Sequence, residues 1–288
     1  MQTPRSVRWL RFLFWVLAVI ITLASAVYQR VTGPTYPLEG EIFIAGQTVH
    51  YEIPRNAETT GDALVSIAVP ATVTGAVFWK RYKTDDALTE TPMVRDAEGL
   101  SAHLPVQPPA GKLRYHLVLD DGEHKVKLPE DGATVIRFKD PVPLWAIVPH
   151  VLFMFLAMLL AARTGLEAIR PTGQLRCHAW WTFGFLFAGG FVFGPIVQQY
   201  AFGQAWTGFP YGCDLTDNKV LIAFIAYAVA LIVLGVRRPI RARERWAAVI
   251  ATVVMLGIFM IPHSMYGSEL DYSKLESGVS VTEAIGQG

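Results

Sequence analysis

Three short stretches of the chain hold residue types that bind metals in proteins. His150 follows Pro149, and His263 follows Pro262. Between them lies 211–219, a loop sequence with one of the two cysteines and two aspartates. Imidazole and carboxylate groups suit zinc, manganese or iron, and a thiolate favours zinc or copper. The sequence therefore allows a divalent metal site, with zinc favoured, whose candidate ligands are His150, Asp214, Asp217, His263, Glu269 and Cys213.

Other interpretations of the same residues stay open. Asp214 and Asp217 are spaced like the capping residue and the third residue of a helix, where the helix dipole favours acids, and Lys219 could pair with one of them. His150 and His263 could instead be axial ligands of one b-type haem. There is no HExxH or CxxC pattern, so the spacing gives no strong metal signature. A metal with an open coordination position would activate water, which leaves a metal-dependent hydrolase as an alternative without naming its substrate.

The elements that must position these residues are membrane helices. Of the 288 residues, 52% are hydrophobic and 17% are charged, whereas soluble domains carry about 25% charged residues. The net charge of +1 gives no indication of nucleic-acid binding. A spanning helix needs about 20 predominantly apolar residues. Five segments without an Asp, Glu, Lys or Arg come close to that length and predict five spans: 12–28, 144–162, 179–197, 220–236 and 246–261.

Arginine gathers on one side of these spans. Three arginines precede the first span, three lie within 163–176 and five lie within 237–245, whereas 198–219 and the segment 265–288 hold one lysine each. Because positively charged loops stay in the cytoplasm, we expect a cytoplasmic amino terminus and an external carboxyl terminus. Cys177 and Cys213 then lie on opposite sides and cannot form a disulfide. The first span also carries a cleavage-like pattern, 24–26, but its long apolar stretch favours an uncleaved anchor.

The segment 31–142 predicts a domain of β-strands. Alternating apolar and polar residues run through 41–44, 48–53, 64–69, 73–82, 113–119 and 134–138, with Asp-Gly turns at 121–122 and 131–132. About seven short strands in this length fit an immunoglobulin-like β-sandwich without a disulfide. The expected aromatic core members are Phe43, Tyr51, Phe78, Trp79, Tyr115 and Phe138.

Four strings resemble a family of uncharacterised bacterial multi-span inner-membrane proteins: 28–37, 107–113, 214–219 and 262–264. The likeness covers most of the chain and implies a bacterial inner membrane, but that family has no assigned activity. The resemblance also implies that a His can occupy the position of Cys213, which would preserve a metal ligand there.

These observations favour a non-enzymatic membrane scaffold or accessory subunit of a membrane complex. We expect an N-terminal membrane anchor over 1–30, a periplasmic β-sandwich over 31–142, a four-helix membrane bundle over 143–264 and a periplasmic tail over 265–288. The tail after residue 272 has few large apolar residues, so we expect it to carry little packed structure. The expected partners are the lipid bilayer and other membrane subunits or a second copy. A metal-binding membrane protein and a haem-binding electron-transfer subunit are the alternatives.

Overall fold

The chain divides into two units. The structure, a computed structural model, describes all residues except 1–3, 237–238, 263–266 and 288. The helical unit comprises Met1–Gly33, Val142–Gln199 and Gln204–Gly267, and the β unit comprises Pro34–Pro141, Tyr200–Gly203 and Ser268–Gly288. The chain therefore passes from one unit to the other at five places.

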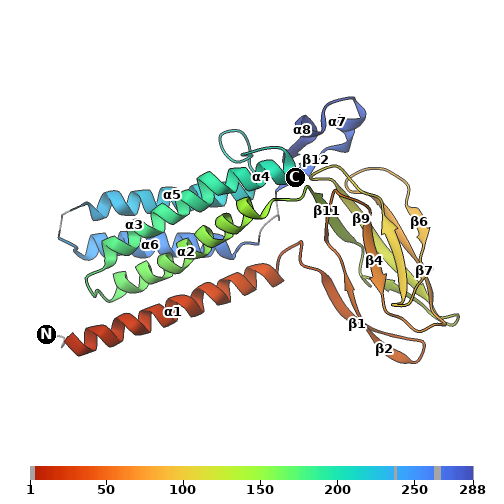
Figure 1. Cartoon of the computed structure of the whole chain (residues 1–288), viewed down its shortest axis with the longest axis horizontal. Coiled ribbons are helices and arrows are strands. Elements are labelled where there is room, and N and C mark those ends of the chain that lie inside the picture. Colours follow the sequence, from red (N-terminus) through yellow and green to blue (C-terminus); the bar gives the residue numbers. More distant parts are fainter. Residues whose placement is uncertain (1–3, 237–238, 263–266, 288) are drawn as a thin grey trace. The chain divides into compact units, whose positions relative to one another are not determined.

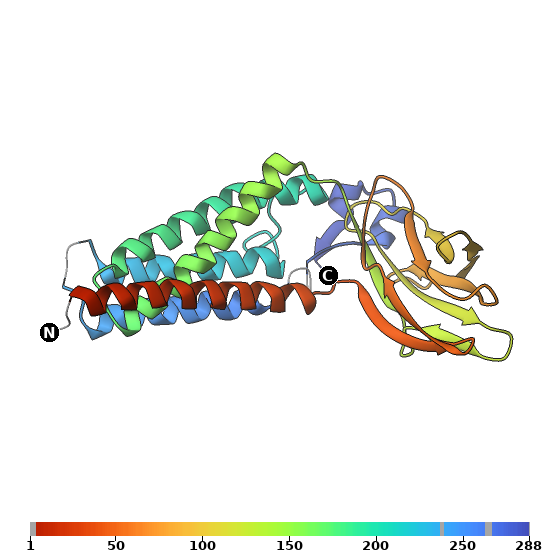
Figure 2. The ribbon, with the colours of Figure 1, turned by 60° about the horizontal axis from the view of Figure 1, so that its bottom comes forward.

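The helical unit is a bundle of long helices (Figures 1 and 2). They are α1 (Pro4–Val31), α2 (Leu144–Ile169), α3 (Leu175–Phe187), α4 (Gly194–Phe202), α5 (Leu215–Leu234) and α6 (Ala242–Met260). Among the described residues, four helices are long and apolar enough to cross a membrane: Ser6–Val31, Leu144–Ile169, Leu175–Phe202 and Leu215–Leu234. These four match the first four expected spans. The fifth expected span lies in α6, whose first turn contains Arg243, Glu244 and Arg245, so its apolar part is shorter.

The third of these helices is built from three pieces. α3 continues into the π-helical turn η1 (Ala188–Phe193) and then into α4. Pro195, near the start of α4, has no N–H to donate, and its ring crowds the carbonyl group four residues earlier. A π turn is a common way for a helix to absorb such an interruption, and here the helix continues past the proline.

Small residues allow the helices to pack closely. α1 packs along α2 and α6, and α5 packs along α6. A side chain added at Gly190 would come within 2.4 Å of Val220 on α5, so this glycine sets the distance between η1 and α5. The centre of the unit is filled by alanines, methionines and aromatic rings from α2, α3, α5 and α6.

Among the described residues of the β unit, three sheets surround one core, and a fourth small sheet lies in its C-terminal segment. β1 (Leu38–Ile44) pairs with β2 (Gln47–Ile53). β4 (Ala63–Ile67), β8 (Leu100–Leu104) and β7 (Val94–Arg95) form the second sheet. The third has the order β3-β11-β9-β5-β6, with β10 also paired to β9. Its strands are β3 (Asn56–Glu58), β11 (Thr134–Lys139), β9 (Lys112–Asp120), β5 (Thr74–Arg81), β6 (Thr89–Pro92) and β10 (Lys125–Leu128).

Alternation along the strands decides which side chains enter this core. Every second residue of β9 is fully buried, from Leu113 to Leu119, and packs against residues of the other sheets. Tyr115 and Phe138 are fully buried as expected, but the expectation for Phe43 is wrong because it is 71% exposed. β1 points Ile42 and Ile44 into the core, so the residue between them faces outward.

Residues 268–287 are packed on the β unit, so the expectation of an unpacked tail is wrong. β12 (Ser268–Leu270) pairs with β13 (Ile285–Gln287), and the short helices α7 (Tyr272–Glu276) and α8 (Val281–Ala284) lie between them. Leu270, Tyr272, Ala284 and Ile285 are buried together with Ala110. The sequence does not predict this cluster, because the segment has few large apolar residues and they form no alternating or helical pattern.

Candidate functional site

The acidic loop before α5 is held together by its own carboxylates. Asp214 caps α5: its side chain accepts hydrogen bonds from the backbone N–H of Thr216 at 2.7 Å and from the hydroxyl of Thr207 at 3.0 Å. Asp217 accepts from the backbone N–H groups of Thr207 at 2.6 Å and Gly208 at 3.1 Å. Both carboxylates are buried. The capping interpretation is therefore confirmed, and Asp217 additionally ties the preceding loop to the helix.

The other candidate metal ligands are placed separately. His150 Nδ1 lies 2.9 Å from the carbonyl oxygen of Gly189, within one hydrogen bond. Cys213 is exposed, and Glu269 belongs to the β unit rather than to the helical unit. His263 lies outside the described residues.

Lys219 is buried beside the acidic loop. Its Nζ donates to the carbonyl oxygens of Ile261 at 2.8 Å and Pro262 at 3.1 Å, and the charge of Asp214 attracts it. The lysine thus joins the start of α5 to the end of α6.

No three His, Cys, Asp or Glu side chains come together to hold a metal ion in the part of the chain that the structure describes. The hypotheses of a metal and of a haem therefore depend on sequence positions alone, since both include His263. In the described residues, Asp214 and Asp217 fix the start of α5.

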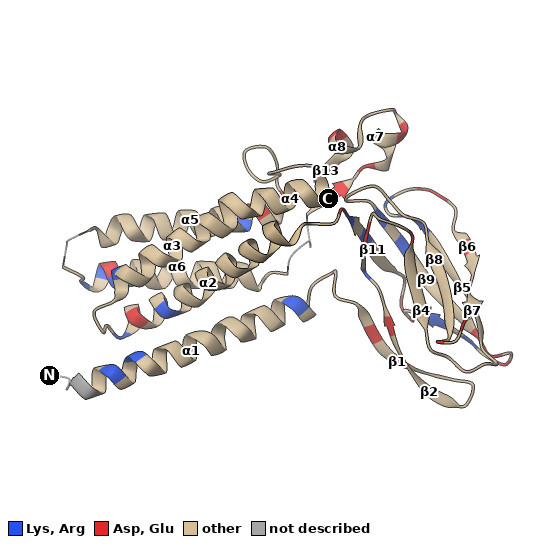
Figure 3. Ribbon diagram, in the orientation of Figure 1, with Lys and Arg blue, Asp and Glu red and all other residues tan. Residues whose placement is uncertain are grey.

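A second polar network lies at the other end of the helices, where Figure 3 shows basic and acidic residues close together. The helix α2 continues beyond the expected span 144–162 to Ile169, and it includes Arg163 and Glu167, which are both fully buried. Arg163 Nη1 lies 2.8 Å from Glu167 Oε2. Glu167 also accepts from the backbone N–H groups of Thr172 at 2.5 Å and Gln174 at 2.9 Å. These hydrogen bonds to Glu167 thus fix the conformation of the connection between α2 and α3.

The same network attaches α1 to the bundle. Arg11 donates to the carbonyl oxygen of Thr172 at 2.6 Å and lies 3.2 Å from its hydroxyl. The guanidinium carbon of Arg163 lies 5.2 Å from the centre of the Phe14 ring and 5.7 Å from that of the Trp15 ring. Arg163 Nε and Nη2 have no hydrogen-bond partner among the described residues, so these ring contacts are its main additional stabilisation.

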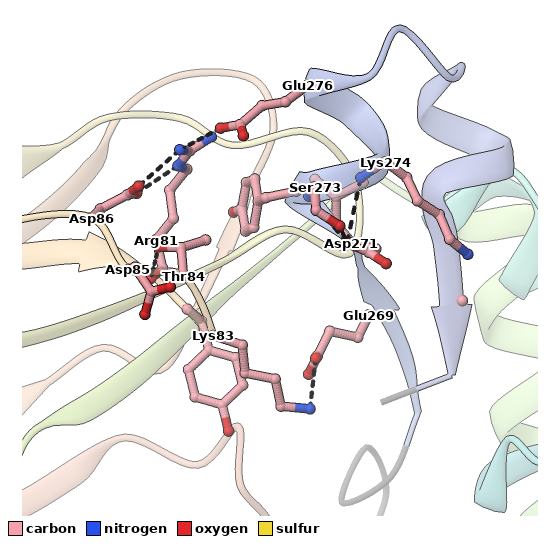
Figure 4. Close-up of a pocket in the computed structure, with 14 residues that line it drawn as sticks. Arg81, Lys83, Thr84, Asp85, Asp86, Glu269, Asp271, Ser273, Lys274 and Glu276 are labelled. Atoms are coloured by element: carbon pink, nitrogen blue, oxygen red, sulfur yellow. Dashed lines mark hydrogen bonds and ion pairs between the residues drawn. The ribbon is translucent and has the colours of Figure 1, made fainter.

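The β unit contains a charged pocket of about 710 Å³ between the end of β5, the loop after it and the C-terminal segment (Figure 4). Glu269 on β12 lies 2.5 Å from Lys112 Nζ and 2.7 Å from Lys83 Nζ. Arg81 bridges Asp86 and Glu276, each at 2.6 Å. We refer to this set as the ionic clamp: Arg81, Lys83, Asp86, Lys112, Glu269 and Glu276.

The electrostatics of the ionic clamp favour the charged forms of three of its members, whereas burial lowers the pKa of Lys112 despite its hydrogen bond to Glu269. Burial alone would raise the pKa of Glu269, but hydrogen bonds from Lys112 and Lys83 outweigh burial and hold it below its ordinary value. The hydrogen bond to Glu269 raises the pKa of Lys83. The hydrogen bond from Arg81 lowers the pKa of Asp86 to about 2. Glu269, Lys83 and Asp86 are therefore ionised at neutral pH and hold the C-terminal segment against the strands.

The two networks that the sequence did not predict left different signals. Arg163 and Glu167 have the i, i+4 spacing of a helical ion pair, which could have extended the predicted span. Lys112 and Glu269 are 157 residues apart, and no local pattern links them.

Comparison with protein-family models, with curated proteins and with solved structures found no match for this chain.

Proposed function

We propose that the chain is a non-enzymatic integral membrane protein, a scaffold or accessory subunit of a membrane complex, that presents the β unit on the periplasmic side of a bacterial inner membrane. The carrying observation is the connectivity: the chain passes between the two units at five places, the last leading to the segment held by the ionic clamp. A domain on one flexible linker samples many positions. Five connections remove much of that freedom, which suits a scaffold.

The surface of the helical unit supports the membrane setting. Large apolar side chains face outward along the helices; Ile232, for example, is 76% exposed. Tryptophan favours the membrane–water interface. Five exposed tryptophans lie close to helix starts: Trp9, Trp145, Trp180, Trp181 and Trp246.

The connectivity also supports α6 as a fifth span. Tyr200–Gly203 at the end of α4 and Ser268–Gly288 after α6 belong to the same unit as Pro34–Pro141. If α1, α2 and α3–α4 each cross, the chain reaches the β unit after α4, and α5 takes it away again. Only a crossing by α6 brings it back before residue 268. Arginines at the start of α6 can extend to the headgroups, which lengthens its effective span.

The contacts of α1 support a retained anchor rather than a removed signal peptide. Phe14, Ala18, Thr22 and Ser25 form a buried face on α1. Near the other end of the helix, Gln29 Nε2 donates to the carbonyl oxygen of Phe259 at 2.6 Å. For the β unit, a single core shared by sheets of short strands supports the proposed immunoglobulin-like sandwich.

The two native cysteines provide a matched test of orientation. Cys177 in the first turn of α3 and Cys213 just before α5 are both exposed. The variants Cys177→Ser and Cys213→Ser each leave one thiol. In intact spheroplasts, a membrane-impermeant maleimide should label the variant that retains Cys213 and spare the one that retains Cys177, while both react after lysis. The reverse pattern would contradict the proposed orientation.

Association state tests the scaffold role. The full chain, extracted from its native membrane in several mild detergents and in lipid nanodiscs, should run as a homo-oligomer or with the same partner each time. Mass spectrometry of the intact assembly gives its composition. A clean monomer under every condition would overturn the scaffold proposal without affecting the topology.

A further inference from the structure

We propose that a groove at the amino-terminal end of α1 binds one anionic phospholipid, through its phosphate and an acyl chain. The groove has a volume of about 480 Å³ and is lined by Ser6, Trp9, Leu10, Phe12, Leu13 and Arg170. All but one of these residues come from α1, and Arg170 directly follows α2. This inference goes beyond the scaffold role and requires only that α1 lies in a membrane.

The buried network fixes the geometry of this groove. The Arg11 side chain donates a hydrogen bond to the carbonyl oxygen of Thr172 at 2.6 Å, and the Glu167 carboxylate accepts one from the backbone N–H of the same residue at 2.5 Å. The connection after α2 is thereby tied both to α1 and to its own helix. Arg170, two residues before Thr172, is consequently brought to the same groove as Leu10 and Leu13.

The α1 side of the groove suits an acyl chain and a headgroup boundary. Trp9 is 69% exposed, Phe12 is 61% exposed and Leu13 is 48% exposed. Leu10 and Leu13 are three residues apart and so lie on one face of the helix. Trp9, near the helix start, has the ring type that favours the headgroup level.

The charge of the groove selects the headgroup. Arg170 is exposed, and its side chain makes no hydrogen bond or ion pair with any residue that the structure describes. A guanidinium can donate two parallel hydrogen bonds to phosphate oxygens. None of the described residues that line the groove is an Asp or Glu. The ammonium of a zwitterionic headgroup would therefore find no carboxylate partner, and an anionic headgroup is preferred.

Native mass spectrometry of the full chain in a non-ionic detergent measures this preference. Phosphatidylglycerol and phosphatidylcholine with identical acyl chains are titrated separately, and the affinity for the first bound lipid is compared. Wild type should bind phosphatidylglycerol more tightly. Arg170→Gln should lower that affinity by about fivefold, the effect of about one basic residue near an anionic membrane surface. Arg8→Gln is the matched control, because it removes the same charge from an exposed position on α1 that does not line the groove.

A second variant tests the apolar part of the groove. Leu13→Gln changes a half-exposed side chain, so the fold should be kept. It should weaken both lipids to a similar extent and leave their affinity ratio unchanged.

Three results would overturn the proposal. Equal affinities of wild type for the two lipids would show that the headgroup is not selected. Equal losses in Arg170→Gln and Arg8→Gln would show diffuse surface charge rather than a site. Displacement of phosphatidylglycerol by inorganic phosphate, with no effect of Leu13→Gln, would show a phosphate site that makes no use of the acyl chain.

Discussion

Replacing Glu269 with Gln tests whether the ionic clamp holds the C-terminal segment on the β unit. The Glu269 side chain is 14% exposed, and its two partners differ: the Lys112 side chain is 16% exposed, whereas that of Lys83 is 56% exposed. An exposed ion pair contributes about 0–1 kcal/mol, so Lys83 adds little. Leaving a fully buried charge without its partner costs about 3–5 kcal/mol. Lys112 retains some exposure, and we therefore expect Glu269→Gln to destabilise the segment by about 2 kcal/mol.

Hydrogen exchange measures this loss locally in the full chain. The N–H of Leu270 is bonded to the carbonyl of Ala110 at 3.1 Å, and that of Asp271 to the carbonyl of Ala284 at 2.9 Å. A loss of about 2 kcal/mol should speed exchange at these two amides by about 30-fold. Glu276→Gln is the control, since it removes a charge from the same segment at a side chain that is 60% exposed. That variant should change exchange by about fivefold or less.

The pH dependence gives an independent check. Because the folded-state pKa of Glu269 lies below its ordinary value of 4.5, the carboxylate stabilises the segment fully above that pH. The stabilisation is lost as the pH falls through the lowered pKa. Exchange in wild type, corrected for intrinsic rates, should therefore accelerate at acid pH, and the Glu269→Gln variant should lack this increment. Identical exchange in the Glu269 and Glu276 variants, or wild-type protection that persists in acid, would refute the assignment.

Three further predictions follow from the same structure. Truncation at Ser277 should lower the melting temperature, because it removes β13, the partner of β12. Ile285→Ala alone should lower the free energy of unfolding, measured with denaturant, by about 2–4 kcal/mol. An unchanged melting temperature of the truncated chain would show that the segment adds no stability. Asp217→Ala should destabilise the protein by about 1–3 kcal/mol, since two buried N–H groups lose their acceptor, and equal stability to wild type would contradict this. Elemental analysis of protein purified without metal affinity should give less than one metal per chain; stoichiometric zinc that disappears in Asp214→Ala would restore the metal hypothesis.

The strand positions could be predicted from sequence because alternation is a local property. The six predicted runs correspond to β1, β2, β4, β5, β9 and β11. The Asp-Gly turn expected at 121–122 lies in the connection between the paired strands β9 and β10. The error at Phe43 has a specific cause. Its aromatic type suggests a core position, but it alternates along β1 with Ile42 and Ile44, which face the core, and so it lies on the outer face.

The charged networks could not be predicted in the same way. The expected second span ends at residue 162, before Arg163, because a charged residue inside a membrane helix is costly. In the structure the helix continues, and the buried Arg163 guanidinium is stabilised by its ion pair with Glu167 and by its contact with the Phe14 ring on α1. The balance depends on contacts with α1, which precedes α2 by more than a hundred residues, and no window of sequence contains it.

Three of the acidic residues that the structure describes, Glu167, Asp217 and Glu269, have one property in common. Glu167 accepts hydrogen bonds from backbone N–H groups of the α2–α3 connection, and Asp217 accepts them from backbone N–H groups of the loop before α5. Glu269, in the C-terminal segment, forms ion pairs with Lys83 and Lys112 of the strand region. A general base or a metal ligand needs a lone pair directed at a reacting group or an ion. At each of these centres the carboxylate oxygens are directed instead at groups that fix a chain segment in place. Substitution of any of these three carboxylates should therefore change folding or assembly.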